Sequence, residues 1–152
     1  TVNELGLGNA VTLLGPKSHT EVKAKLRKAS IFIQHSVTAE NGDQESQGIS
    51  LVEAMASGIP VVTTDHNGFS DTVLHGETGL LSAEMDVPAL GQNLRRVASD
   101  PALARKMGAD GRQRAETHYD AHQLARRLRD VMFSDRGAAV GGTTGIGLEA
   151  GA

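Results

Sequence analysis

Short apolar runs alternate along this chain with segments in which apolar residues recur at every third or fourth position. The runs are continuous and bounded by glycine, proline or polar residues. This pattern predicts strands at residues 11–15, 30–34, 61–64 and 80–82. Because runs that are apolar throughout are typical of strands covered on both faces, we expect a buried sheet.

The segments between these runs have the periodicity of amphipathic helices. They predict helices at residues 20–28, 50–56, 70–74, 86–98 and 101–118, and a last helix from residue 121. Gly58 is a natural C-cap, and Asp100 followed by Pro101 is typical of a helix start. Strands that alternate with helices predict an α/β fold with a parallel sheet and helices on both faces.

A chain of 152 residues has room for one domain of ordinary size with a real core. Its last part consists mostly of small residues and has no periodicity. We therefore expect the folded domain at residues 1–133 and a disordered Gly/Ala-rich tail at residues 134–152.

Composition narrows the classes of function. Aromatic residues make up only 3% of the chain and its net charge is -3, so we expect no nucleic-acid partner. The absence of cysteine excludes disulfides, thiolate nucleophiles and cysteine metal sites, and it fits a reducing, cytoplasmic setting. No apolar run approaches the roughly 20 residues that span a bilayer.

Two acids, Glu45 and Glu53, flank the start of the helix predicted at residues 50–56. Glu45 lies in the polar loop before this helix, and Glu53 lies about one turn into it. Two carboxylates so placed can bind different parts of one polar ligand. Gly48 leaves the backbone open where the helix begins, so unpaired amides and the positive end of the helix dipole would face a diphosphate. The pattern favours a sugar nucleotide as ligand.

Each candidate residue also has a purely structural interpretation. Ser50 and Glu53 have the spacing of a capping box, and Glu45 is by itself an ordinary solvated loop acid. Asp43 and Glu45 do not make a convincing metal pair, because no histidine nearby adds a third ligand, so we predict no metal. His66 follows a strand at the edge where doubly wound sheets bind ligands, which makes it a candidate substrate-binding residue.

Three further features leave both interpretations open. His35 ends the preceding strand, as His66 ends its own. The turn at residues 76–79 has backbone amides that suit a ligand, but it also serves as a plain helix-to-strand connection. Basic residues on the last helix form either a solvated face or a contact with anionic lipid. They are Arg126, Arg127 and Arg129.

Residues 7–15, 29–36 and 45–63 resemble the strands and the donor loop in the C-terminal, nucleotide-sugar-binding half of GT-B-fold retaining glycosyltransferases of the family 4 type. The resemblance covers residues 2–133 and implies a Rossmann-like domain that lacks its N-terminal part. It implies that Glu53 binds the ribose hydroxyls and that Glu45 contacts the donor sugar as a catalytic residue. The backbone at Gly48, Ile49 and Ser50 would meet sugar and phosphate.

The same resemblance implies transfer of a hexose, with retention, from a nucleotide diphosphate sugar to a sugar or lipid hydroxyl. It implies no cofactor. Such enzymes have an acceptor domain that precedes this half, so we expect the chain to be part of a longer enzyme and inactive alone. Its setting would be the cytoplasm, or the inner face of the membrane. Two alternatives stay open, a non-catalytic nucleotide-binding or interaction module and a sugar-nucleotide epimerase of the same fold.

Overall fold

The computed structural model describes residues 2–134, so most of the predicted tail lies outside the described residues. Three parallel strands form its sheet in the order β1 (Phe32–Gln34), β2 (Val61–Thr64), β3 (Gly79–Ser82). Val61 of the central strand pairs with Phe32 on one side and with Gly79 on the other. The predicted parallel sheet is therefore confirmed, and all three strands end at the same edge.

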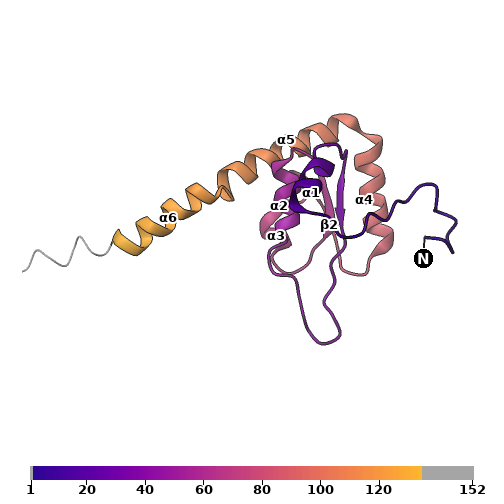
Figure 1. Cartoon of the computed structure of the whole chain (residues 1–152), viewed down its shortest axis with the longest axis horizontal. Coiled ribbons are helices and arrows are strands. Elements are labelled where there is room, and N and C mark those ends of the chain that lie inside the picture. The colour runs from indigo at the N-terminus through magenta and orange to yellow at the C-terminus, as the bar shows by residue number, and fades with distance from the viewer. Residues whose placement is uncertain (1, 135–152) are drawn as a thin grey trace, which may run out of the picture.

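Helices cover both faces of this sheet (Figure 1). Successive residues of a strand point to opposite faces. Val61 accordingly packs in one apolar cluster with residues of α2 (Ile49–Ala56) and α3 (Phe69–Thr72). Its neighbour Val62 packs in a second cluster with residues of α4 (Val87–Ser99). This two-sided burial explains why β2 is apolar or β-branched at every position.

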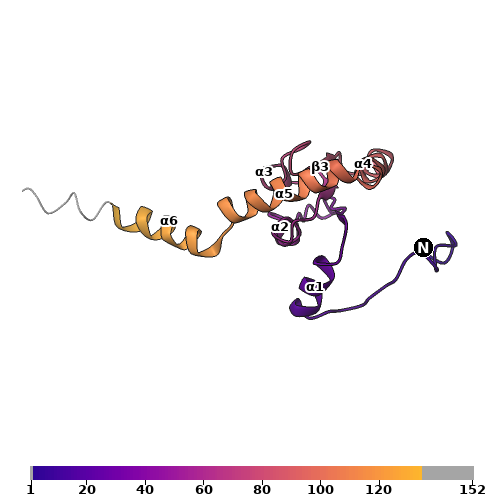
Figure 2. The same cartoon turned by 90° about the horizontal axis from the view of Figure 1, so that it is seen from above.

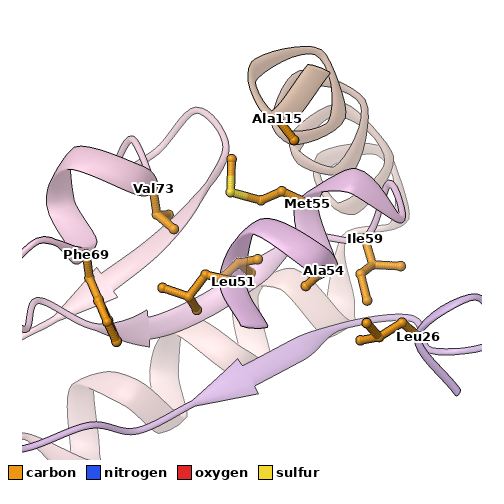
Figure 3. Packing of buried hydrophobic residues seen from close by; sticks show 9 residues of the cluster. Leu26, Leu51, Ala54, Met55, Ile59, Phe69, Val73 and Ala115 are labelled. Carbon is orange, nitrogen blue, oxygen red and sulfur yellow. The ribbon is translucent and has the colours of Figure 1, made fainter. Parts of the chain in front are cut away.

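The long helix α5 (Pro101–His118) packs against both α2 and α4. Helix α5 approaches the residues just after α2 closely, because Gly108 lies against the carbonyl of Gly58 with no room for a Cβ atom between them. Further along the helix, Ala115 joins the first cluster, and Figure 3 shows Met55 of α2 lying between Ala115 and Val73. The packing fixes α2, the helix that carries three of the predicted ligand residues, Ile49, Ser50 and Glu53.

The predicted strand at residues 11–15 does not form. Val11, Leu13 and Leu14 are exposed in an irregular segment. An apolar run becomes a strand only where another strand completes its hydrogen bonds. Among residues 2–134 no strand pairs with this segment, although β1 leaves one edge unpaired.

Both terminal helices form as predicted. The first, α1 (His19–Leu26), begins with a capping box in which Ser18 and Glu21 bond to each other's backbone amides. The last, α6 (Ala121–Ser134), extends away from the body of the domain in both views (Figures 1 and 2). None of its described side chains is buried, so its apolar stripe is uncovered there. In the described part of the chain no helix is both long and apolar enough to cross a membrane.

Candidate functional site

The carboxyl ends of the strands hold a polar cluster built around Glu45. Gln34, the last residue of β1, donates from Nε2 to Oε2 of Glu45 over 2.8 Å. The hydroxyl of Ser36 donates to the same oxygen over 3.2 Å. No described residue bonds Oε1, the other carboxylate oxygen. Glu45 is thus held by one oxygen while the other is open to a ligand.

The start of α2 adjoins this cluster. Ser50 donates from its hydroxyl to Oε1 of Gln34 over 2.5 Å, which ties the helix to the end of β1. The N-cap is Gly48, in the left-handed region at φ 60°, and it supplies no side-chain cap. Within the described chain no acceptor bonds the amides of Ile49 and Ser50. Unpaired amides at a helix N-terminus favour an anion.

His66 connects the backbone of Glu45 to the end of β3. Its ring is fully buried, and its Nε2 accepts the backbone N–H of Glu45 over 3.1 Å. Neutral imidazole then carries its proton on Nδ1, which donates to Oε1 of Glu84 over 2.5 Å. The backbone amide of Thr38, with His66 as the second cause, holds the pKa of the Glu84 carboxyl below its ordinary value.

Glu53 lies apart from this cluster, in a cleft of about 410 Å³ between α1, α2 and α5. Nδ1 of His19 stands 3.5 Å from its Oε1. The capping box predicted from its spacing with Ser50 does not form, because α2 begins earlier, with Gly48 as its N-cap. Ser50 therefore lies inside the helix, where its hydroxyl bonds Gln34. The other lining residues are mainly basic or small: Lys23, Leu26, Arg27, Ala56, Ser57 and Arg112.

The remaining candidates take up less specific positions. His35 is exposed on the surface. The turn at residues 76–79 closes on itself through a hydrogen bond from Gly76 to Gly79. Asp43 accepts from the side chain of Asn41, and residues 2–134 contain no group of three side chains able to hold a metal ion. The basic residues of α6 bond mostly to nearby backbone or to Asp130.

The sequence patterns missed Gln34 and Glu84. In the sequence, Gln34 is only the polar end of an apolar strand, and Glu84 lies in a short polar segment after β3. The signal that could have found them was their place at or just beyond the carboxyl ends of parallel strands, where such sheets bind ligands.

A parallel sheet flanked by helices defines a domain of the open α/β class, and in that class ligands bind at the carboxyl edge, where this sheet gathers carboxylates and free helix amides. The chain belongs to the family described as "Glycosyl transferases group 1", which matches residues 1–114. It is 35% identical over 126 residues to the amylovoran biosynthesis glycosyltransferase AmsK of Erwinia amylovora. It is 33% identical over 125 residues to a glycogen synthase of Mycobacterium tuberculosis.

These alignments cover 83% and 82% of this chain but 31% and 29% of the two relatives, so the chain spans about a third of their length. Among solved structures, sucrose-phosphate synthase from Thermosynechococcus elongatus matches 91% of this chain and 33% of its own at 30% identity, with a TM-score of 0.76. Anabaena HepE in complex with UDP matches 88% of this chain and 35% of its own at 23% identity and TM-score 0.78. The predicted GT-B-type α/β fold is thereby confirmed.

Proposed function

We propose that this chain is the donor-binding part of a longer retaining glycosyltransferase of the family 4 type. The whole enzyme would move a hexose from a nucleotide diphosphate sugar to a sugar or lipid hydroxyl. The observation that carries the proposal is the single free oxygen of Glu45, held beside the uncapped start of α2 in a chain of the glycosyltransferase group 1 family.

The two halves of the donor would be recognised separately. The free Oε1 of Glu45 would accept from a sugar hydroxyl, and the amides of Ile49 and Ser50 would receive the diphosphate. As the bond to the sugar breaks, negative charge grows on the leaving diphosphate, where fixed amide dipoles stabilise it more than in the ground state. HepE, which shares the fold, was solved in complex with UDP. That complex supports a nucleoside diphosphate as the leaving group.

Glu53 would bind the nucleoside. Its carboxylate is about one-third exposed and opens into the cleft beside α1. A carboxylate accepts two ribose hydroxyls at once, so it suits a nucleoside better than it suits a bare phosphate. The basic side chains Lys23, Arg27 and Arg112 line the same cleft.

The test compares the full-length protein with its Glu53→Gln variant. Titration calorimetry with a panel of nucleoside diphosphates and their sugar conjugates should show selective binding in the wild type. Because the glutamine would offer one acceptor fewer to the ribose hydroxyls, we expect binding to weaken about 10- to 100-fold. Glu77→Gln, at an exposed position in the turn at residues 76–79, is the matched control and should bind as the wild type does.

Three outcomes would contradict this proposal. Unchanged binding and turnover in Glu53→Gln would remove the nucleoside role. Selective binding without transfer to any acceptor would favour a non-catalytic binding module. Release of free nucleotide with an isomerised sugar, in the absence of an acceptor, would favour an epimerase.

A further inference from the structure

The carboxylate of Glu84 holds two points of the chain that lie far apart in sequence. Glu84 follows β3, and its Oε2 accepts the backbone N–H of Thr38 over 2.8 Å. Its Oε1 accepts the Nδ1 proton of His66 over 2.5 Å and the Thr38 hydroxyl over 3.3 Å. One acid therefore ties the segment after β1 to the segment after β2.

His66 carries this link on to Glu45. Both of its ring nitrogens are occupied, Nδ1 by Glu84 and Nε2 by the backbone N–H of Glu45. The ring is fully buried and stands edge-on to Phe69, with 5.4 Å between the ring centroids. A ring so enclosed has no nitrogen left for a ligand, but it fixes the position of the amide that it accepts.

Residues 38–45, here called the Glu45 loop, depend on these bonds. Figure 1 shows the loop projecting beyond the sheet between β1 and α2. Every residue of the loop is exposed, so apolar burial does not hold it in place. Its first residue is bonded to Glu84, and its last is bonded to His66.

We propose that Glu84 and His66 are positioning residues that set the place of Glu45 opposite the donor sugar. The inference rests on the proposed function, in which Glu45 contacts that sugar. The side-chain bonds from Gln34 and Ser36 orient the Glu45 carboxylate. The Glu84–His66 pair fixes the backbone that carries it, together with a bond of 3.1 Å from Nδ2 of Asn67 to the Glu45 carbonyl. Both sets of bonds are needed, because a carboxylate displaced by about 1 Å loses much of its effect on the reaction.

The experiment uses Glu84→Gln in the full-length protein. Glutamine keeps the shape of the side chain but has an NH2 group in place of one carboxylate oxygen, so in this position it cannot accept from both the backbone N–H of Thr38 and Nδ1 of His66. Glu84 is partly exposed, which makes the substitution compatible with folding. The matched control is Glu40→Gln, an exposed acid on the same loop for which the structure shows no hydrogen bond.

We expect kcat/KM for the nucleotide sugar to fall about 10- to 100-fold in Glu84→Gln and to stay at the wild-type value in Glu40→Gln. The dissociation constant of the free nucleoside diphosphate should not change, because this ligand lacks the sugar that Glu45 contacts. In a Glu45→Ala background, Glu84→Gln should cost nothing further, since it acts through Glu45. Equal weakening of diphosphate and nucleotide sugar, or additive losses in the double variant, would overturn the inference.

Hydrogen exchange separates this inference from the proposed function. The amides of Thr38 and Glu45 should exchange faster in Glu84→Gln than in the wild type, and Glu40→Gln should leave them unchanged. Unchanged exchange in Glu84→Gln would overturn the positioning role whatever the activity. If the wild type transfers no sugar, but the amides of Thr38 and Glu45 still exchange faster in Glu84→Gln than in the wild type, the proposed function is overturned and the anchoring of the loop stays supported.

Discussion

Replacement of Gly48 by alanine should damage the fold and the proposed donor site together. Gly48 is the N-cap of α2 and has φ 60°, where a side chain is strained. A Cβ atom there would lie 2.7 Å from Cδ1 of Leu51 and 2.9 Å from Cε1 of Phe69. Both neighbours are fully buried, so neither can move aside without disturbing the first apolar cluster.

Two terms make up the expected loss of folding free energy. The left-handed conformation costs a residue with a Cβ about 1–2 kcal/mol. Overpacking against Leu51 and Phe69 adds about 1–3 kcal/mol. Gly76→Ala isolates the first term, because Gly76 has φ 83° but open space around its Cβ position. We therefore expect a loss of about 2–5 kcal/mol at Gly48 and about 1–2 kcal/mol at Gly76.

Urea unfolding of the wild type and both variants, followed by circular dichroism, measures these losses as shifts of the midpoint at constant slope. Gly48→Ala should also weaken binding of the nucleotide sugar, because the unpaired amides at the start of α2 move with the cap. Equal losses in the two variants would refute the steric part of the reasoning. Unchanged binding in a clearly destabilised Gly48→Ala would refute the link between the cap and the site.

Two other predictions concern packing and pH. Gly108→Ala should lower the free energy of unfolding by about 2–4 kcal/mol, because its Cβ would meet the carbonyl of Gly58. Gly111→Ala makes only ordinary contacts and should raise the free energy of unfolding by up to about 1 kcal/mol through helix propensity. Thermal unfolding of both variants checks the contrast. The bond from the Thr38 amide lowers the pKa of Glu84, so its contribution to stability is complete above the ordinary value of 4.5 and is lost as pH falls through the lowered pKa. As pH is lowered below 4.5, the urea midpoint should therefore fall more steeply in the wild type than in Glu84→Gln. Parallel curves of midpoint against pH would contradict this.

The sheet and its helices could be predicted from the sequence because the strands are continuous apolar runs, whereas in the helices apolar residues recur at every third or fourth position. The segments that became β1, β2 and β3 are continuous apolar runs, and α2 ends where Gly58 predicts. Residues 11–15 have the same local pattern but stay irregular and exposed. Local pattern reports what a segment can pack against, but it does not report whether a partner strand is present.

The candidate site could be predicted only where its contacts are local. Glu45, Gly48 and Ser50 lie near one another because they surround one helix start. The bond from Gln34 to Glu45 spans 11 residues, and the bond from Thr38 to Glu84 spans 46. No spacing rule identifies such pairs, since the sheet brings them together. The capping box of Ser50 fails because α2 begins earlier than its sequence pattern predicts, with Gly48 as the N-cap.

The position of Glu45 thus depends on all three strands. Gln34 belongs to β1, His66 follows β2, and Glu84 follows β3. A relative shift of any two strands would therefore separate the carboxylate from its backbone support. The two-sided core that fixes the strand register consequently also fixes the polar cluster around Glu45, so a buried position such as Val62 contributes to the geometry of the proposed donor site.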